Sequence, residues 1–277
     1  MQAIYGINVL LEKIFAAALW PMRGLDPIWA LVAVSALTGL IMVWIFGKTS
    51  NQGAIARMKR KILGNLIAVR LFRHDLGVVM RTQGRILRDT LVYMRYSLLP
   101  LLVMIVPVVL IMIQLHHHFA LAPLEPGEPT VLKAQVADPA MLTEQEIALE
   151  VPEGLVVETP PVRAVATGEV AALMRAERPD NYTVKIRLGE RVIEKRVRAG
   201  GGWGAVASRR IGRNPWSLLL YPGEAPIAAD TPVRAVSVAH PPLPLTAFGF
   251  GVNWLVAFLV LSIAFGFAFK GPLGIEV

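Results

Sequence analysis

The chain has 277 residues, of which 55% are hydrophobic and 17% are charged, with a mean hydropathy of +0.53 and no cysteine. Soluble domains average about 25% charged residues, so this composition excludes an ordinary soluble enzyme and also a disordered or fibrous chain. The absence of cysteine excludes disulfides, thiolate metal sites and a cysteine nucleophile.

The net charge of +8 is concentrated in one segment. Residues 48–95 contain eleven basic and two acidic residues, whereas residues 120–245 carry a net charge of −1 and both ends of the chain are neutral. Membrane proteins keep basic loops in the cytoplasm, so we expect residues 48–95 to be cytoplasmic. The N-terminus and residues 120–245 then lie outside a plasma (inner) membrane, and the C-terminus lies inside.

Residues 1–27 predict an amphipathic helix on the outer membrane face. Bulky apolar residues recur at helical spacing before Pro21, and Glu12 and Lys13 interrupt them. This interruption and the lack of a preceding charge argue against a secretory signal. A further membrane span is the alternative for residues 1–22.

Three charge-free stretches are each as long as a helix that crosses a hydrocarbon core of about 30 Å. They predict transmembrane helices at residues 28–47, 97–116 and 246–270. Pro100 and Pro107 lie inside the second of these, where they remove backbone donors and are expected to bend the helix. The stretches contain no Asp, Glu, Lys or Arg at mid-depth, which argues against a proton-coupled transporter or an ion pump.

The basic segment between the first two spans, residues 48–96, predicts a cytoplasmic helical hairpin. Apolar residues recur three or four apart over residues 53–73 and 78–95, with a turn at residues 74–77. Each arm would be about 28 Å long. The basic side chains would contact either anionic lipid headgroups or ribosomal RNA. The candidate contact residues are Arg57, Lys59, Arg60, Lys61, Arg70 and Arg73.

The histidines at positions 116–118 form a metal-like cluster directly before a proline-rich linker, residues 117–129. Three consecutive side chains on a helix point about 100° apart and cannot all ligate one ion, so we expect no metal site. The sequence contains no phosphate-binding loop, nucleophile elbow or zinc-protease motif. We therefore expect neither an enzyme nor a cofactor.

Residues 130–245 predict an extracytoplasmic antiparallel β-sandwich of the immunoglobulin type, acting as a binding or scaffolding module. Short runs of alternating apolar residues are typical of strands, and Gly189-Glu190 fits a two-residue turn between two of them. The expected strands are Thr130–Val136, Glu146–Val151, Pro161–Val165, Tyr182–Leu188, Arg191–Val197, Trp216–Leu220 and Pro232–Val238.

The predicted fold class is an α-helical membrane protein with three transmembrane helices, a cytoplasmic helical hairpin, the inserted β-sandwich and a cytoplasmic tail at residues 271–277.

In this order of elements, the charged hairpin from Lys59 to Tyr93 runs directly into a proline-containing apolar span with Leu98–Leu102 and Ile105–Pro107. The plan resembles the YidC/Oxa/Alb superfamily of membrane protein insertases. It is nearest the minimal three-span branch of archaeal YidC-like proteins and the insertase subunit of the ER membrane protein complex. The resemblance covers roughly residues 1–118 and 246–270. Bacterial YidC differs in carrying a basic residue within its groove and in placing its large outer domain before the three-span core.

The resemblance implies an insertase with a groove that opens to the cytoplasm and to lipid, through which a client helix enters the bilayer. Its partners would be the bilayer, nascent membrane proteins and the ribosome, with no cofactor. The polar candidates to line such a groove are Ser35, Thr38, Gln114, Asn253 and Ser262.

The alternative function is a non-catalytic assembly, tether or sensor protein whose β-domain binds an extracytoplasmic partner. A polar vestibule that faces the cytoplasm would favour the insertase. A dry, tightly packed trio of helices would favour the tether.

Overall fold

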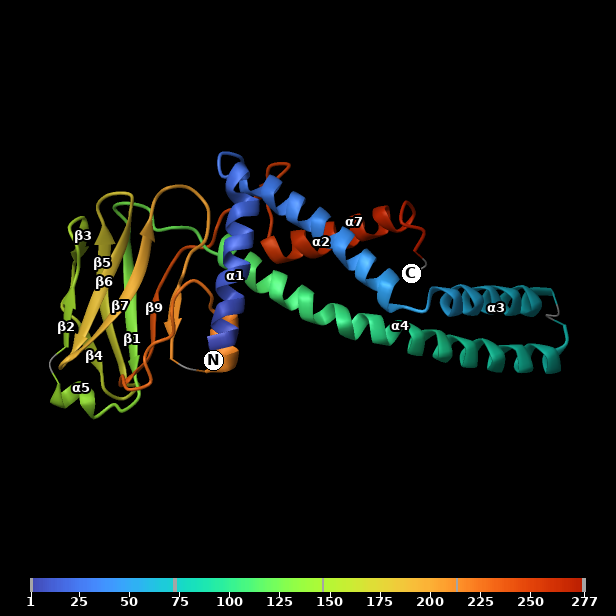
Figure 1. Ribbon diagram of the computed structural model, residues 1–277, viewed down its shortest axis with the longest axis horizontal. Helices are drawn as coiled ribbons and strands as arrows, with labels where there is room; N and C mark the ends of the chain where they lie inside the picture. Colours follow the sequence, from blue (N-terminus) through green and yellow to red (C-terminus); the bar gives the residue numbers. More distant parts are fainter. Residues whose placement is uncertain (1, 72–73, 146, 213, 276–277) are drawn as a thin grey trace. The chain divides into compact units, whose positions relative to one another are not determined.

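The structure is a computed structural model that describes residues 2–71, 74–145, 147–212 and 214–275 (Figure 1). The chain folds as two compact units. Residues 1–30 and 111–254 form one, which we call the sheet unit, and residues 31–110 and 255–277 form the other, which we call the helical unit. Three long apolar helices and a separate region of antiparallel sheet agree with the predicted fold class at this level.

Three helices in the described part of the chain are long and apolar enough to cross a membrane. They are α1 (Gln2–Leu19) with its 3-10 continuation η1 (Trp20–Met22), α2 (Pro27–Thr49) and α4 (Leu76–Phe119). The last helix, α7 (Trp254–Lys270), is apolar but has only 17 residues. Residues 246–253, which we expected to open the third span, instead contain two short paired strands, β10 (Thr246–Ala247) and β11 (Phe250–Gly251).

Helix α1 belongs to the sheet unit, and the two faces of this helix have different surroundings. On one face Ile4 packs against a small cluster that contains Leu218, and the Asn8 side-chain amide donates a hydrogen bond of 2.6 Å to the Leu218 carbonyl. On the other face Ile7 and Leu10 are exposed. This division fits an amphipathic helix at a membrane surface, which stays a prediction.

Helix α3 (Gln52–Leu71) and the first half of α4 run side by side as a helical hairpin (Figure 1). The Asn65 amide donates a hydrogen bond of 3.4 Å to the buried Asp89 carboxylate across the pair. The expected boundary between residues 96 and 97 lies inside α4, which continues as one helix of 44 residues. Pro100 and Pro107 lie within it without ending it.

The sheet unit contains two antiparallel sheets that share one core. The larger has the order β3-β5-β1-β9-β8, with β4 also paired to β5, and consists of β1 (Pro129–Val136), β3 (Leu155–Val157), β4 (Val162–Ala164), β5 (Glu169–Ala176), β8 (Arg209–Ile211) and β9 (Val233–Val238). The smaller has the order β2-β6-β7 and consists of β2 (Ile147–Glu150), β6 (Asp180–Leu188) and β7 (Arg191–Ala199). A short helix, α5 (Met141–Glu144), follows β1.

Pairing within these sheets confirms the predicted turn at Gly189-Glu190. Leu188 pairs with Arg191, and Gly189 has a φ of +56°, which glycine adopts without strain. The predicted strand at Trp216–Leu220 is wrong, because these residues form helix α6 (Pro215–Leu220). The Asn214 side chain accepts a hydrogen bond of 3.1 Å from the Trp216 amide and Pro215 occupies the first turn, so the capping signal outweighs the apolar run.

The predicted proline-rich linker at residues 117–129 is not a separate segment: residues 117–119 end helix α4, and the rest packs within the sheet unit. Leu124 is buried in the shared core, and its amide donates a hydrogen bond of 3.0 Å to the Arg198 carbonyl. The Ala122 amide donates a hydrogen bond of 2.8 Å to the Pro241 carbonyl. Residues 120–129 therefore belong to the β-domain.

Strand β7 lies at the edge of the smaller sheet, and a buried ion pair closes this edge. The Lys195 ammonium lies 2.5 Å from the Glu224 carboxylate and also donates to the Ala207 carbonyl. The other oxygen of Glu224 accepts a hydrogen bond of 2.7 Å from the Arg196 amide, a donor that the edge strand would otherwise leave unpaired. Burial lowers the pKa of the Lys195 ammonium, and Glu224 counteracts this effect.

Candidate functional site

The helical unit is held together on one side by a close contact between α2 and α7. A side chain carbon built on Gly39 of α2 would lie 2.8 Å from the Ser262 carbonyl oxygen and 2.9 Å from the Gly266 amide nitrogen of α7. Ser262 and Gly266 are one helical turn apart, the small-residue spacing that lets membrane helices approach closely. Only glycine at position 39 permits this approach.

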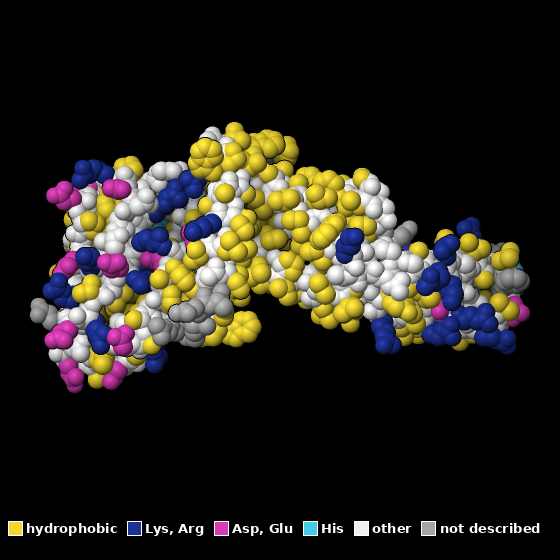
Figure 2. All heavy atoms as spheres, in the orientation of Figure 1, with side chains coloured by type: hydrophobic (Ala, Val, Ile, Leu, Met, Phe, Trp, Pro, Cys, Tyr) yellow, Lys and Arg dark blue, Asp and Glu magenta, His cyan; other side chains and the backbone are white. Residues whose placement is uncertain are grey.

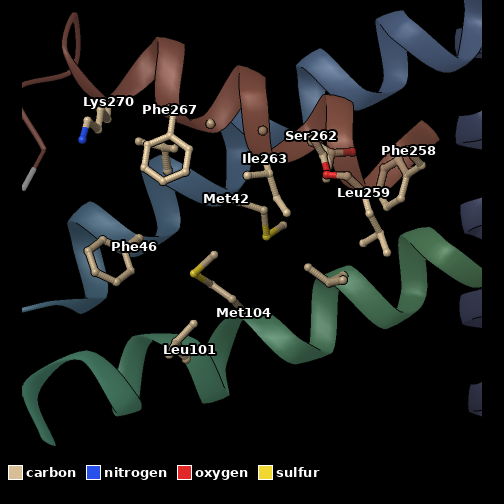
Figure 3. Close-up of a pocket in the computed structure, with 15 residues that line it drawn as sticks. Met42, Phe46, Leu101, Met104, Phe258, Leu259, Ser262, Ile263, Phe267 and Lys270 are labelled. Atoms are coloured by element: carbon tan, nitrogen blue, oxygen red, sulfur yellow. The ribbon is translucent and has the colours of Figure 1, made fainter. Parts of the chain in front are cut away.

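Helix α4 does not close onto this pair, and a groove of about 320 Å³ remains between α4 and the α2–α7 pair (Figure 3). Met42 and Met104 point into the space from opposite walls (Figure 3). Most of the other lining side chains are aliphatic or aromatic, such as Phe46, Leu101 and Phe267. The groove is therefore mainly apolar.

Three side chains with polar groups also line the groove: Thr38, Ser262 and Lys270. The Ser262 hydroxyl donates a hydrogen bond of 3.1 Å to the Leu259 carbonyl of its own helix. The Lys270 ammonium lies 5.1 Å from the centre of the Phe267 ring, and Figure 3 shows these two residues toward the opposite end of the groove from Ser262. The groove thus has hydroxyl groups and a cation at its margins.

Two of the five predicted groove residues, Thr38 and Ser262, lie together at the groove. Ser35 is buried on α2 and donates a hydrogen bond of 2.7 Å to the Leu31 carbonyl, without lining the groove. Gln114 and Asn253 belong to the sheet unit. The Gln114 amide is fully buried with no hydrogen-bond partner among the described residues.

Sequence reasoning missed the side chains that form most of the groove. Met42 and Met104 are unremarkable within apolar stretches, and only helix packing brings them face to face. Lys270 is the last residue of α7 and also the last residue of the predicted span at residues 246–270, but it is not among the predicted groove residues. In the sequence, its position directly after a long charge-free stretch was the available signal.

The basic residues of the hairpin form a surface separate from the groove. Arg57, Arg60, Lys61 and Arg70 are exposed on α3, and Lys59 is half-buried. Figure 2 shows Lys and Arg side chains gathered along the α3–α4 hairpin, beside apolar patches. Arg73 lies outside the described residues.

The three consecutive histidines contact different partners in the sheet unit. The His116 ring packs edge-on against Trp254 with the ring centres 5.9 Å apart, and a ring nitrogen of His118 lies 2.9 Å from the Gln114 carbonyl oxygen. Within the described residues, no group of three or more His, Cys, Asp or Glu side chains is arranged to hold a metal ion.

Comparison with protein-family models, with curated proteins and with solved structures found no match to this chain. The resemblance to membrane protein insertases therefore rests on the order of elements and the residues given above.

Proposed function

We propose that this protein is an insertase or chaperone-like protein of the plasma (inner) membrane that receives apolar client helices at the groove between α2, α4 and α7. The observation that carries the proposal is the groove itself, which is apolar and bounded on one side by the close α2–α7 contact and on the other by α4. A protein that only tethered its β-domain to a membrane would need no such opening.

The lining suits clients of varied sequence. Methionine is flexible and polarisable, and surfaces that accept many partners use it for this reason. Met42 and Met104 can change rotamer and let a Leu or Phe side chain of a client enter the space between them.

The margins of the groove suit clients that carry a short polar tail. In the predicted topology Lys270 and the basic hairpin lie at the cytoplasmic side, where they would attract acidic residues that flank a client helix. The groove differs from the polar vestibule expected from the sequence, because few polar groups line it. We therefore propose that it holds the apolar part of a client, and that the polar part stays at the margin.

A photoreactive residue can test this proposal. In growing cells, p-benzoylphenylalanine at Met104 should crosslink newly made membrane proteins. The same residue at Val106, whose side chain is exposed on α4, should crosslink mainly lipid. Equal capture of new membrane proteins at both positions, or capture at neither, would contradict the proposal.

The β-domain favours a second candidate function, the assembly or tethering role. Its two sheets have a core of their own, which an insertase groove does not require. We propose that this domain is an immunoglobulin-like sandwich on the outer side and that it binds an extracytoplasmic partner. If cells that lack the protein insert small membrane proteins normally but lose a periplasmic or extracellular complex, the tethering function is the better account.

A further inference from the structure

A second cavity in the helical unit lies beside the turn between α2 and α3. It has a volume of about 760 Å³ and shares no lining residue with the groove. Asn51, Arg95 and Tyr96 line it with polar groups, and Leu98, Leu99 and Leu102 line it with apolar ones. The cavity therefore joins a polar region to an apolar wall.

Four of these side chains form one stripe along α4. Arg95, Leu98, Leu99 and Leu102 are spaced three, one and three residues apart, so they lie on one face of the helix. Over about 10 Å along the axis this face changes from cationic to purely aliphatic. A phospholipid is complementary to this face, because its anionic phosphate is followed by a hydrocarbon chain.

The polar end of the cavity is suited to an anion. No ion pair of Arg95 is found within the described part of the chain, whereas the nearby Arg88 lies 3.5 Å from the Asp89 carboxylate. The Asn51 side chain accepts a hydrogen bond of 3.0 Å from the Ala54 amide and so caps the start of α3. The positive end of the α3 dipole therefore lies at the rim of the cavity.

We propose that this cavity binds one anionic phospholipid. Its phosphate accepts hydrogen bonds from the Arg95 guanidinium, which can offer two parallel donors, and from the Tyr96 hydroxyl. One acyl chain lies along Leu98, Leu99 and Leu102. The site is independent of the client groove, and the predicted topology would place it in the cytoplasmic leaflet.

Lipid retention on the full chain tests the proposal. The protein is extracted in a mild detergent, mixed with equal amounts of phosphatidylglycerol and phosphatidylethanolamine, and examined by native mass spectrometry. We expect one phosphatidylglycerol to be retained in preference to phosphatidylethanolamine. Inorganic phosphate should not displace it, because the acyl chain supplies part of the binding; displacement by phosphate would assign the cavity to a soluble anion instead.

Matched variants locate the site. Arg95→Gln should lower retention of phosphatidylglycerol about tenfold, and Arg95→Lys should keep most of it. Arg88→Gln removes an equal charge outside the cavity and should leave retention unchanged. Leu99→Trp fills the apolar wall without changing the charge and should also lower retention. Equal losses for Arg88→Gln and Arg95→Gln, unchanged retention in Leu99→Trp, or equal retention of both lipids in the parent would overturn the proposal.

Discussion

The sheet unit and the helical unit bury their apolar residues in different ways. In β6 and β7 buried and exposed side chains alternate, and the buried ones fill a core shared with the larger sheet. In the helical unit the Leu and Ile side chains of α4 around residues 98–106 are largely exposed. The sheet unit therefore supplies its own interior, whereas the helical unit requires an apolar surrounding to cover its surface, as a bilayer would.

The two units also differ in what fixes their closest contacts. The edge of the smaller sheet is closed by the buried Lys195–Glu224 ion pair. The Lys195 ammonium also donates to the Ala207 carbonyl, and the Arg196 amide donates to Glu224. Helices α2 and α7 can approach closely because Gly39 has no side chain. Substitutions at the two contacts should therefore lower stability for different reasons. At the ion pair a buried charge loses its partner, and at Gly39 an added side chain clashes with the backbone of α7.

The largest effect is expected at the buried ion pair. Lys195→Met leaves the Glu224 carboxylate buried without its cation and should lower the free energy of unfolding by about 3–5 kcal/mol. Thermal unfolding of a fragment of residues 120–245 measures it, and we expect this fragment to be soluble with a β-type circular dichroism spectrum. The fragment includes Leu124, which packs in the core shared by the two sheets.

The exposed pair of Arg191 with Asp230 provides the control. Arg191→Met should cost less than about 1 kcal/mol, because solvent screens an exposed pair. Equal losses in the two variants would show that the buried pair does not close the sheet edge as described.

A smaller loss is expected at the α2–α7 contact. Gly39→Ala places a side chain carbon against the backbone of α7 and should lower stability by about 1–3 kcal/mol, which thermal unfolding of the full chain in detergent can detect. Gly64→Ala on α3 meets open space and should be neutral or raise stability by up to about 1 kcal/mol. If the two variants behave alike, the close approach of α2 and α7 is wrong.

The sheet unit should also lose stability in mild acid through His240. Burial lowers the pKa of His240 to about 4, and a buried ring nitrogen of this residue has no partner among the described residues. The unfolded chain takes up the proton near its ordinary pKa of 6.5, so stability falls as pH drops from 6.5 toward 4. We expect a loss of about 2–3 kcal/mol over this range, which His240→Gln should abolish. A His240→Gln fragment with the same pH dependence as the parent would assign the loss to other groups.

The smallest effect on folding is expected in the hairpin. Changing Arg57, Lys59, Arg60 and Lys61 to Gln keeps helix propensity nearly unchanged and leaves seven basic residues in the segment. Binding to anionic liposomes or to ribosomes should weaken, and the difference from the parent should shrink as salt rises. Flotation and co-sedimentation separate the two partners. If the variant and the parent bind liposomes and ribosomes equally at every salt concentration, the basic cluster serves only to set the topology.

The elements that could be predicted from sequence are those with a strong local pattern. The turn at Gly189-Glu190 and the strands β6 and β7 follow from alternation and turn chemistry. Strand β5 was not predicted, although it pairs with β1, β3 and β4 at the centre of the larger sheet. Its residues are mostly Ala, Leu and Met, which favour helices, so tertiary pairing overrides local propensity.

The groove could be predicted only in part for a related reason. Thr38 and Ser262 are polar residues in apolar stretches and therefore attract notice in a sequence. Met42 and Met104 become lining residues only because the Gly39 contact pairs α2 with α7 and leaves α4 apart. That arrangement depends on contacts between distant segments, which periodicity within one helix does not encode.

Labelling of single cysteines tests most directly the predicted topology, in which the helical hairpin and the β-domain lie on opposite sides of the membrane. The chain contains no cysteine, and both Gly64 on the hairpin and Glu190 at the β6–β7 turn are exposed. With a membrane-impermeant maleimide on intact cells or spheroplasts, Glu190→Cys should be labelled at once and Gly64→Cys only after lysis. Labelling of Gly64→Cys from outside, or protection of Glu190→Cys until lysis, would contradict the account.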